Sequence, residues 1–156
     1  MPRVAIALGS NLGDRRHHLE TAIDLLMPHL RQALVSTFLD TPAEGVPDEQ
    51  PRYLNAVVVG EAQLLPAALL KRLLSIEEKL GRTRPYWGAP RIIDLDLILY
   101  ADVELHEPGM HVPHLRFRER RFVLEPLAAI APDLRDPVSG KTVVELLAKL
   151  EVRGQK

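Results

Sequence analysis

The sequence contains no cysteine, which excludes disulfide bonds and metal sites built from thiolates. Aromatic residues are also scarce, at 4% of the 156 positions, and the formal net charge at pH 7 is only −1. A chain so nearly neutral offers no general basic surface for nucleic acid or for a membrane. The chain also lacks an apolar run of membrane-spanning length and an N-terminal secretory pattern, so we expect a cytoplasmic protein.

The remaining composition is that of an ordinary globular protein. Hydrophobic residues make up 46% and charged residues 26% of the chain. This length suits one compact domain with a substantial hydrophobic core. No internal repeat, low-complexity tract or linker interrupts the chain, so we expect a single domain over residues 1–156 that acts as a monomer.

The order of hydrophobic patterns predicts the fold class. Short apolar or alternating runs indicate strands over residues 4–8, 34–39, 53–60 and 92–100. Apolar residues at helical spacing indicate helices over residues 15–30, 66–80, 119–130 and 143–150. Irregular structure is expected over residues 41–51, 82–91 and 106–116. This order predicts an α+β fold, a ferredoxin-like split β-α-β sandwich with an antiparallel sheet and helices on one face.

Individual residues mark the expected helix ends. Asp14 is a candidate N-cap of the first helix, and Pro28 should bend or end it. Pro66 suits a first helical turn, and Gly81 should close the same helix. Pro126 should shorten or kink the third helix.

The strongest chemical pattern is an alternation of acidic and apolar residues within the strand expected over 92–100. Successive side chains on a strand point to opposite faces, so Asp94 and Asp96 share one face, with Cα atoms about 6.5 Å apart. The opposite, core-facing set is Ile93, Leu95, Leu97 and Leu99. Two such carboxylates can hold one divalent cation or bridge two, while a solvated edge strand is the plainer alternative.

Arginines gather on either side of this acidic strand. Three precede it, namely Arg82, Arg84 and Arg91, and four follow it, namely Arg116, Arg118, Arg120 and Arg121. Guanidinium groups match phosphate oxygens with paired hydrogen bonds. Arginines beside a paired-aspartate metal site therefore indicate triphosphate transfer, although a genome that favours arginine would also enrich this residue.

Two weaker patterns concern a flat ligand and a turn. Tyr53 and Asn55 share one strand face, where a ring can stack on a heterocycle while an amide pairs with its edge, although a half-buried strand is the simpler explanation. Ser10 and Asn11 lie between glycines, but the glycine spacing matches neither common phosphate-binding loop. We therefore interpret that segment as a turn followed by a helix cap.

Taken together, these motifs resemble the 6-hydroxymethyl-7,8-dihydropterin pyrophosphokinase family of folate biosynthesis. The resemblance covers nearly the whole chain. The matching motifs are Gly9-Ser10-Asn11-Leu12-Gly13, Thr41-Pro42 with Gly45, Gln50-Pro51-Arg52-Tyr53-Leu54-Asn55-Ala56, Glu77 with Gly81-Arg82-Thr83-Arg84, Ala89-Pro90-Arg91-Ile92-Ile93-Asp94-Leu95-Asp96, Val112-Pro113-His114 and Arg120-Arg121-Phe122-Val123-Leu124-Glu125-Pro126-Leu127.

The resemblance implies transfer of the β,γ-pyrophosphoryl unit of ATP to 6-hydroxymethyl-7,8-dihydropterin, with release of AMP. It implies two magnesium ions on Asp94 and Asp96, and catalytic roles for Arg82 and Arg91. The implied ATP-binding residues are Glu77, Arg84, Trp87, Arg91, Ile98, His114 and Arg120. The implied pterin-binding residues are Thr41, Pro42, Gly45, Tyr53, Asn55 and Phe122.

This chain departs from the family pattern at several positions. Trp87 lies one residue further from Pro90 than the family's Trp-Gly-Pro-Arg motif has it, and Leu115 stands where some members have tyrosine. Gly109 replaces an arginine of some members, and Glu44 replaces an apolar residue. Two other classes remain open: a ligand-binding regulatory module without catalysis, and a different metal-dependent nucleotidyl- or phosphotransferase.

Overall fold

The computed structural model describes residues 1–43, 50–81 and 90–154. Its strands are β1 (Arg3–Ser10), β2 (Leu30–Val35), β3 (Leu39–Thr41), β4 (Tyr53–Ala62), β5 (Asp94–Tyr100), β6 (Leu105–Glu107) and β7 (Met110–Val112). Its helices are α1 (Arg15–Leu26), α2 (Pro66–Lys79), α3 (Arg121–Ile130) and α4 (Val143–Gly154), with the short 3-10 helices η1 (Met27–His29) and η2 (Phe117–Glu119). In the part that the structure describes, no helix is long and apolar enough to cross a membrane.

The central sheet has the strand order β2-β4-β1-β5, and β3 also pairs with β4. Every pairing within it is antiparallel. Since β1 and β2 both run against β4, they are parallel to each other and α1 connects them. In the same way, β4 and β5 both run against β1 and are connected by α2. The two β-α-β units interlock, which confirms the predicted α+β split β-α-β fold.

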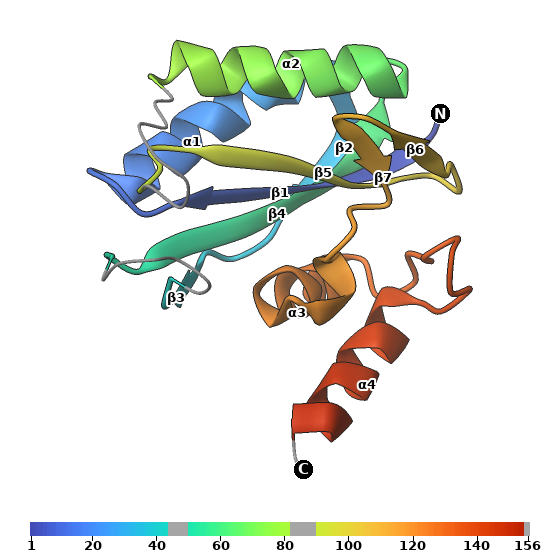
Figure 1. The fold of residues 1–156 in the computed structure, drawn as a ribbon. Helices are drawn as coiled ribbons and strands as arrows, with labels where there is room; N and C mark the ends of the chain where they lie inside the picture. The colour runs from blue at the N-terminus through green and yellow to red at the C-terminus, as the bar shows by residue number, and fades with distance from the viewer. Residues whose placement is uncertain (44–49, 82–89, 155–156) are drawn as a thin grey trace.

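Helices cover both faces of this sheet, so the expectation of helices on one face is wrong (Figure 1). One hydrophobic core lies under α1 and α2 and includes Ile6 of β1 and Leu69 of α2. The second core lies on the opposite face, where Val57 of β4 packs with Leu124 and Leu127 of α3. Both faces of β1, β4 and β5 carry buried apolar residues, and such a sheet must be covered on both sides.

A β-bulge in β5 changes which side chains share a face. Ile6 pairs with Leu97 while Ala5 pairs with Leu99, so Ile98 is an extra residue opposite β1. Leu97 consequently packs in the core under α1 and α2, whereas Leu99 packs in the core under α3. The prediction that Leu99 shares a face with Leu97 is therefore wrong. The alternation before the bulge is as predicted, and the acidic residues lie in that part.

The predicted helix ends are confirmed. The Asp14 side chain accepts a hydrogen bond from the His17 N–H at 3.2 Å, which caps α1. Pro28 lies in η1, immediately after α1 ends. Pro66 is the first residue of α2, and Gly81 follows it with a φ of 89°, a conformation that favours glycine. Pro126 lies inside α3, which is a short helix of 10 residues.

Two regions of irregular or short structure differ from expectation. The strand predicted over 34–39 is two strands, β2 ending at Val35 and β3 beginning at Leu39. The segment predicted to be irregular after Tyr100 contains the hairpin of β6 and β7, whose strands have three residues each. Strands this short give too few alternations for a sequence pattern to reveal.

Candidate active site

A cavity of about 520 Å³ opens on the α3 side of the sheet. Its wall combines the C-terminal end of β1, the N-terminal ends of β4 and β5, the end of β3 and the start of α3. These ends meet at one edge because β4 and β5 both run antiparallel to β1. The volume lies in the range of small-molecule sites, about 300–1,000 Å³.

Small residues of β1 form the floor between two different walls. Gly9 pairs with Asn55 on one side and with Asp94 on the other. A Cβ at Gly9 would lie 3.2 Å from Asn55 Oδ1 and 3.4 Å from Tyr53 Cδ1. Glycine therefore lets the Tyr53 ring and the Asn55 amide lie close over β1. Ala7 continues this low floor toward Asp96.

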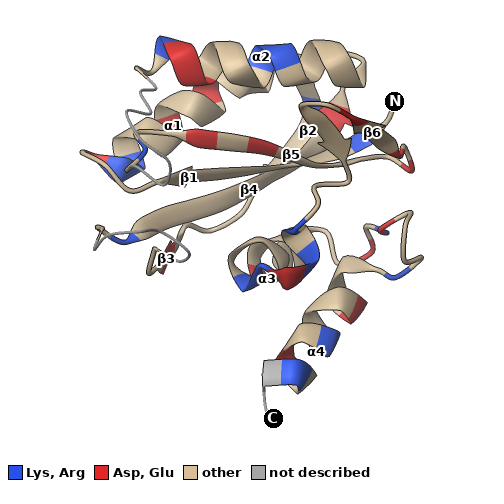
Figure 2. Cartoon of the chain, viewed as in Figure 1, with Lys and Arg blue, Asp and Glu red and all other residues tan. Residues whose placement is uncertain are grey.

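The β5 wall carries the acidic pair (Figure 2). Both Asp94 and Asp96 line the cavity, as the alternation predicted. Burial first, and the like charge of Asp94 second, raise the pKa of Asp96 from 3.8 to about 7. The guanidinium groups of Arg120 and Arg91 oppose this shift. Asp94 itself accepts a hydrogen bond from Arg91 Nη1 at 2.8 Å.

This wall fits a cation that a ligand helps to coordinate. Within residues 1–43, 50–81 and 90–154, no group of three or more histidine, aspartate or glutamate side chains could hold a metal alone. Magnesium, however, is commonly held by one or two carboxylates together with substrate phosphates and water. The donor set of Asp94 and Asp96 therefore fits magnesium bound with a polyphosphate.

The β4 wall offers an aromatic ring and an oriented amide. Asn55 Nδ2 donates to Thr41 Oγ1 at 2.7 Å and to the Leu39 carbonyl at 3.3 Å, so β3 fixes the orientation of the amide. Its Oδ1 then lies over β1 beside Gly9, where it can accept a hydrogen bond from a ligand. Tyr53 precedes Asn55 on the same face and lines the same cavity.

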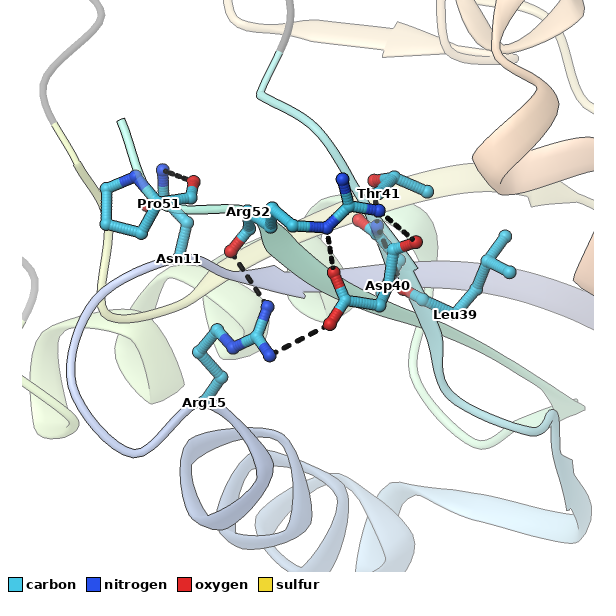
Figure 3. A network of polar contacts seen from close by, with 8 residues as sticks. Asn11, Arg15, Leu39, Asp40, Thr41, Pro51 and Arg52 are labelled. Carbon is cyan, nitrogen blue, oxygen red and sulfur yellow. Dashed lines mark hydrogen bonds and ion pairs between the residues drawn. The ribbon is translucent and has the colours of Figure 1, made fainter. Parts of the chain in front are cut away.

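A charged network holds β3 against β4 (Figure 3). The carboxylate of Asp40 accepts from Arg52 Nε at 2.7 Å and from Arg15 Nη2 at 3.0 Å. Arg15 Nη1 also donates to the Arg52 carbonyl at 2.9 Å. The start of α1 thereby fixes the strands that carry Thr41 and Tyr53.

The third wall comes from the segment that enters α3. The guanidinium carbon of Arg120 lies 5.6 Å from the centre of the Phe122 ring, and both side chains line the cavity. A cation over an aromatic ring restrains both groups. Arg116 and Glu119 line the cavity as well.

The structure gathers most of the predicted site residues around this cavity. Those on its wall are Thr41, Pro42, Tyr53, Asn55, Arg91, Asp94, Asp96, Arg120 and Phe122. The predicted residues Gly45, Arg82, Arg84 and Trp87 lie outside the described residues.

Three predicted ATP-binding residues are absent from the wall that the described residues form. Glu77 of α2 is buried on the other side of β5, where its Oε2 accepts from the Leu95 N–H at 2.7 Å. Ile98 is buried in the core under α3, and its carbonyl accepts from the His114 N–H at 3.0 Å.

His114 lies near the charged groups of the site. Burial lowers its pKa to about 4, and the positive charge of Arg120 contributes to the lowering. Its Nδ1 accepts from the Arg116 N–H at 3.1 Å. The ring is therefore neutral at pH 7, and its proton is carried on Nε2.

Four positions in or beside the cavity escaped the sequence patterns. Gly9 and Ala7 form the floor, and Glu119 lines the wall of the cavity. Asn11, interpreted as part of a turn, is fully buried and contacts both sides of the site. The motif Gly9-Ser10-Asn11 was a usable signal, whereas nothing in the sequence marks Glu119.

Comparison with known proteins gives the family. Residues 5–132 match the model of 7,8-dihydro-6-hydroxymethylpterin-pyrophosphokinase (HPPK). The 2-amino-4-hydroxy-6-hydroxymethyldihydropteridine pyrophosphokinase of Methylorubrum extorquens is 42% identical over 156 residues, covering 99% of this chain and 97% of that protein. The Pseudomonas aeruginosa enzyme of the same name is 40% identical over 154 residues, covering 97% of this chain and 94% of that protein.

Solved structures of longer proteins share the fold. A crystal structure of HPPK-DHPS with substrates has a TM-score of 0.74 at 14% identity, covering 99% of this chain and 44% of that chain. A Plasmodium falciparum HPPK-DHPS structure has a TM-score of 0.77 at 17% identity, covering 99% of this chain and 46% of that chain. This chain thus spans less than half of those solved chains, and the likeness shows the fold. From the family model and the near-full-length relatives, the chain belongs to the 7,8-dihydro-6-hydroxymethylpterin-pyrophosphokinase family.

Proposed function

We propose that this protein transfers the β,γ-pyrophosphoryl group of ATP to the hydroxymethyl group of 6-hydroxymethyl-7,8-dihydropterin, with release of AMP, as a step of folate biosynthesis. The observation that carries the proposal is the arrangement of two walls across Gly9. The aromatic and amide wall lies on β4, and the acidic wall lies on β5, in one cavity. A flat acceptor and a metal-bound polyphosphate can therefore occupy neighbouring places.

The acceptor is proposed to lie between Tyr53 and Phe122. Both rings line the cavity. Where proteins bind nucleic acids, stacking of a base on an aromatic side chain contributes about 1–3 kcal/mol to binding, and a pterin is a flat heterocycle of the same kind. Asn55 Oδ1 accepts a hydrogen bond from the rim of the pterin, since its Nδ2 is already bonded to β3. Pro42 and Thr41 border the same place, and Gly45 is proposed to complete it.

The triphosphate is proposed to lie along β5. Asp94 and Asp96 would hold two magnesium ions, which supply positive charge that neutralises and aligns the phosphates. Arg91 already lies against Asp94, and Arg120 faces the cavity from the entry to α3, so each can pair with phosphate oxygens. The remaining nucleotide contacts are proposed for Glu77, Arg84, Trp87, Ile98 and His114, with catalytic assistance from Arg82.

The reaction needs alignment more than it needs a covalent intermediate. The hydroxymethyl oxygen attacks the β-phosphorus, and the bond from that phosphorus to the oxygen bridging the α-phosphate breaks. AMP leaves with that oxygen, and the hydroxyl proton is released to water. The stacked and hydrogen-bonded pterin presents its hydroxymethyl group toward β5, so binding itself lowers the barrier by proximity.

Measuring which nucleotide is released tests the function. The protein incubated with ATP, magnesium and the pterin alcohol should release AMP in equal amount to the pterin diphosphate formed. Omission of the pterin is the control, and it should leave ATP intact. Release of ADP would indicate a phosphotransferase instead, and release of pyrophosphate would indicate a nucleotidyltransferase.

A further inference from the structure

Asn11 makes a closed pair of contacts with Arg91. The Asn11 N–H donates to the Arg91 carbonyl at 3.0 Å, and the Arg91 N–H donates to Asn11 Oδ1 at 2.7 Å. Asn11 has an exposed fraction of 0%. The backbone of Arg91 is therefore fixed to a fully buried residue that follows β1.

The other end of the same amide contacts the acceptor side of the site. Asn11 Nδ2 donates to Gln50 Oε1 at 3.0 Å. It also donates to the Pro51 carbonyl at 3.3 Å (Figure 3). Pro51 lies two residues before Tyr53, the first residue of β4. One buried amide thus connects the start of the acceptor wall with Arg91.

Arg91 continues this connection to the acidic wall. Its Nη1 donates to Asp94 Oδ2 at 2.8 Å, and its side chain is 26% exposed. A displacement of residues 50–51 would therefore displace the Asn11 side-chain amide, which is hydrogen-bonded to the backbone of Arg91. Breaking the bonds of a buried amide is unfavourable because it leaves polar groups unsatisfied, so the three parts should move as one unit.

We propose that Asn11 is a positioning residue that couples acceptor binding to the placement of Arg91 beside the phosphates. This inference rests on the proposed function and identifies how its two subsites communicate. Asn11 lies outside the cavity wall that the described residues form, so it acts through Arg91 and the start of β4. Each ligand then binds more tightly when the other has already ordered the shared unit.

Arg15 provides a matched control from the same stretch of chain. It also holds the acceptor wall, through the Arg52 carbonyl and Asp40. None of the contacts described for it reaches Arg91. Arg15→Ala should therefore weaken pterin binding without affecting the communication between the two subsites.

The coupling is measured by titration calorimetry. Pterin affinity is determined with and without a non-hydrolysable ATP analogue and magnesium, and the ratio of the two affinities is the coupling factor. We expect a factor within about 5–150 for the unaltered protein, the usual range of coupled sites. Asn11→Ala should bring this factor close to one and lower kcat more than it raises KM, whereas Arg15→Ala should keep the factor.

Several outcomes would overturn the inference. They are a coupling factor near one in the unaltered protein, an unchanged factor in Asn11→Ala, and equal loss of the factor in Arg15→Ala. If thermal melting shows that Asn11→Ala does not fold, Gln50→Ala decides the question, because it removes one acceptor and keeps the bonds to Arg91. An unchanged factor in Gln50→Ala would then overturn the inference. Failure of the unaltered protein to release AMP would instead contradict the proposed function.

Discussion

The ionisation of Asp96 works against the ligand-free fold. Its folded-state pKa of about 7 exceeds the ordinary 3.8 because of burial first and the charge of Asp94 second. Between these two pH values the folded state binds more protons at this site than the unfolded state. The contribution of Asp96 to the free energy of unfolding therefore falls as pH rises from about 4 to 7. A cation between the carboxylates would remove this penalty.

Asp96→Asn should stabilise the ligand-free protein while it strongly lowers the rate of catalysis. An uncharged amide relieves the repulsion, so the melting temperature at pH 8 should rise, by about 2–4 °C for each kcal/mol gained. At pH 5 the difference should be small, since Asp96 is then protonated. The rate of AMP release should fall at least about a hundredfold, a loss typical of removing one electrostatic contact to the transition state.

Asp102→Asn is the matched control for this change, because Asp102 is an exposed aspartate in the turn after β5. It should leave both the melting temperature and the rate unchanged. If Asp96→Asn kept near-normal magnesium-dependent activity, the assignment of the metal site to β5 would be wrong.

Magnesium should stabilise the protein more strongly at pH 8 than at pH 5.5. Binding requires ionised carboxylates, and at pH 5.5 a proton competes for Asp96. The melting temperature should be measured while the magnesium concentration is raised in 10-fold steps at constant ionic strength. Magnesium should raise the melting temperature, and this increase should grow as pH rises through about 7. A shift of the same size at both pH values would mean that the cation binds elsewhere.

At the scale of elements, a β-bulge separates the part of β5 whose alternation the sequence predicted from the part where the alternation fails. Asp94 and Asp96 lie on the predicted face because they precede the bulge at Ile98, and a strict alternation holds there. Beyond the bulge the alternation fails, so Leu99 was placed on the wrong face. A bulge depends on how β5 fits against β1, which no local pattern in β5 records.

Long-range contacts explain the other differences. The cover that α3 and α4 provide on the second face depends on the path of the chain after β7, which helical periodicity does not specify. Asn11 contributes to the site through hydrogen bonds with residues at positions 50, 51 and 91. Such partners, distant in the sequence, cannot be found from a turn signal alone.

The connection between α3 and α4 depends on a buried ion pair. The Asp136 side chain is 0% exposed and accepts from Arg118 Nε at 2.6 Å and from Ser139 Oγ at 2.7 Å. Burial alone would raise the pKa of Asp136, but the hydrogen bonds from Arg118 and Ser139 hold it below its ordinary value. The carboxylate is therefore ionised, and it needs its partner.

Arg118→Ala should lower the free energy of unfolding by about 3–5 kcal/mol, because it removes the cation paired with a buried carboxylate. Urea denaturation measures this change. Arg121→Ala is the control, since the ion pair of Arg121 with Glu125 is exposed and such pairs contribute about 0–1 kcal/mol. Equal losses in the two variants would show that burial does not set the importance of the Asp136 pair.

At the scale of the whole molecule, the cavity exists because two layers meet at one edge of the sheet. The ends of β1, β4 and β5 supply the floor and two walls, while the segment entering α3 supplies the third wall.

The extent of the domain over residues 1–156, the monomeric state and the cytoplasmic location stay predictions. The same holds for the absence of nucleic-acid and membrane partners.

Phe122 is the main contribution of the C-terminal layer to the proposed acceptor site, so it tests whether that layer takes part in binding. Phe122→Ala removes one stacking ring while Tyr53 and Asn55 remain on β4. The loss of stacking, about 1–3 kcal/mol, should weaken pterin affinity about 5- to 150-fold in the presence of a non-hydrolysable ATP analogue.

Phe38→Ala is the matched control, because Phe38 packs against the core under α1 and α2, away from the cavity. Since Arg120 lies over the Phe122 ring, affinity for the ATP analogue should also fall, but by a smaller factor. Unchanged pterin affinity in Phe122→Ala would place the acceptor against β4 alone and remove α3 from the site.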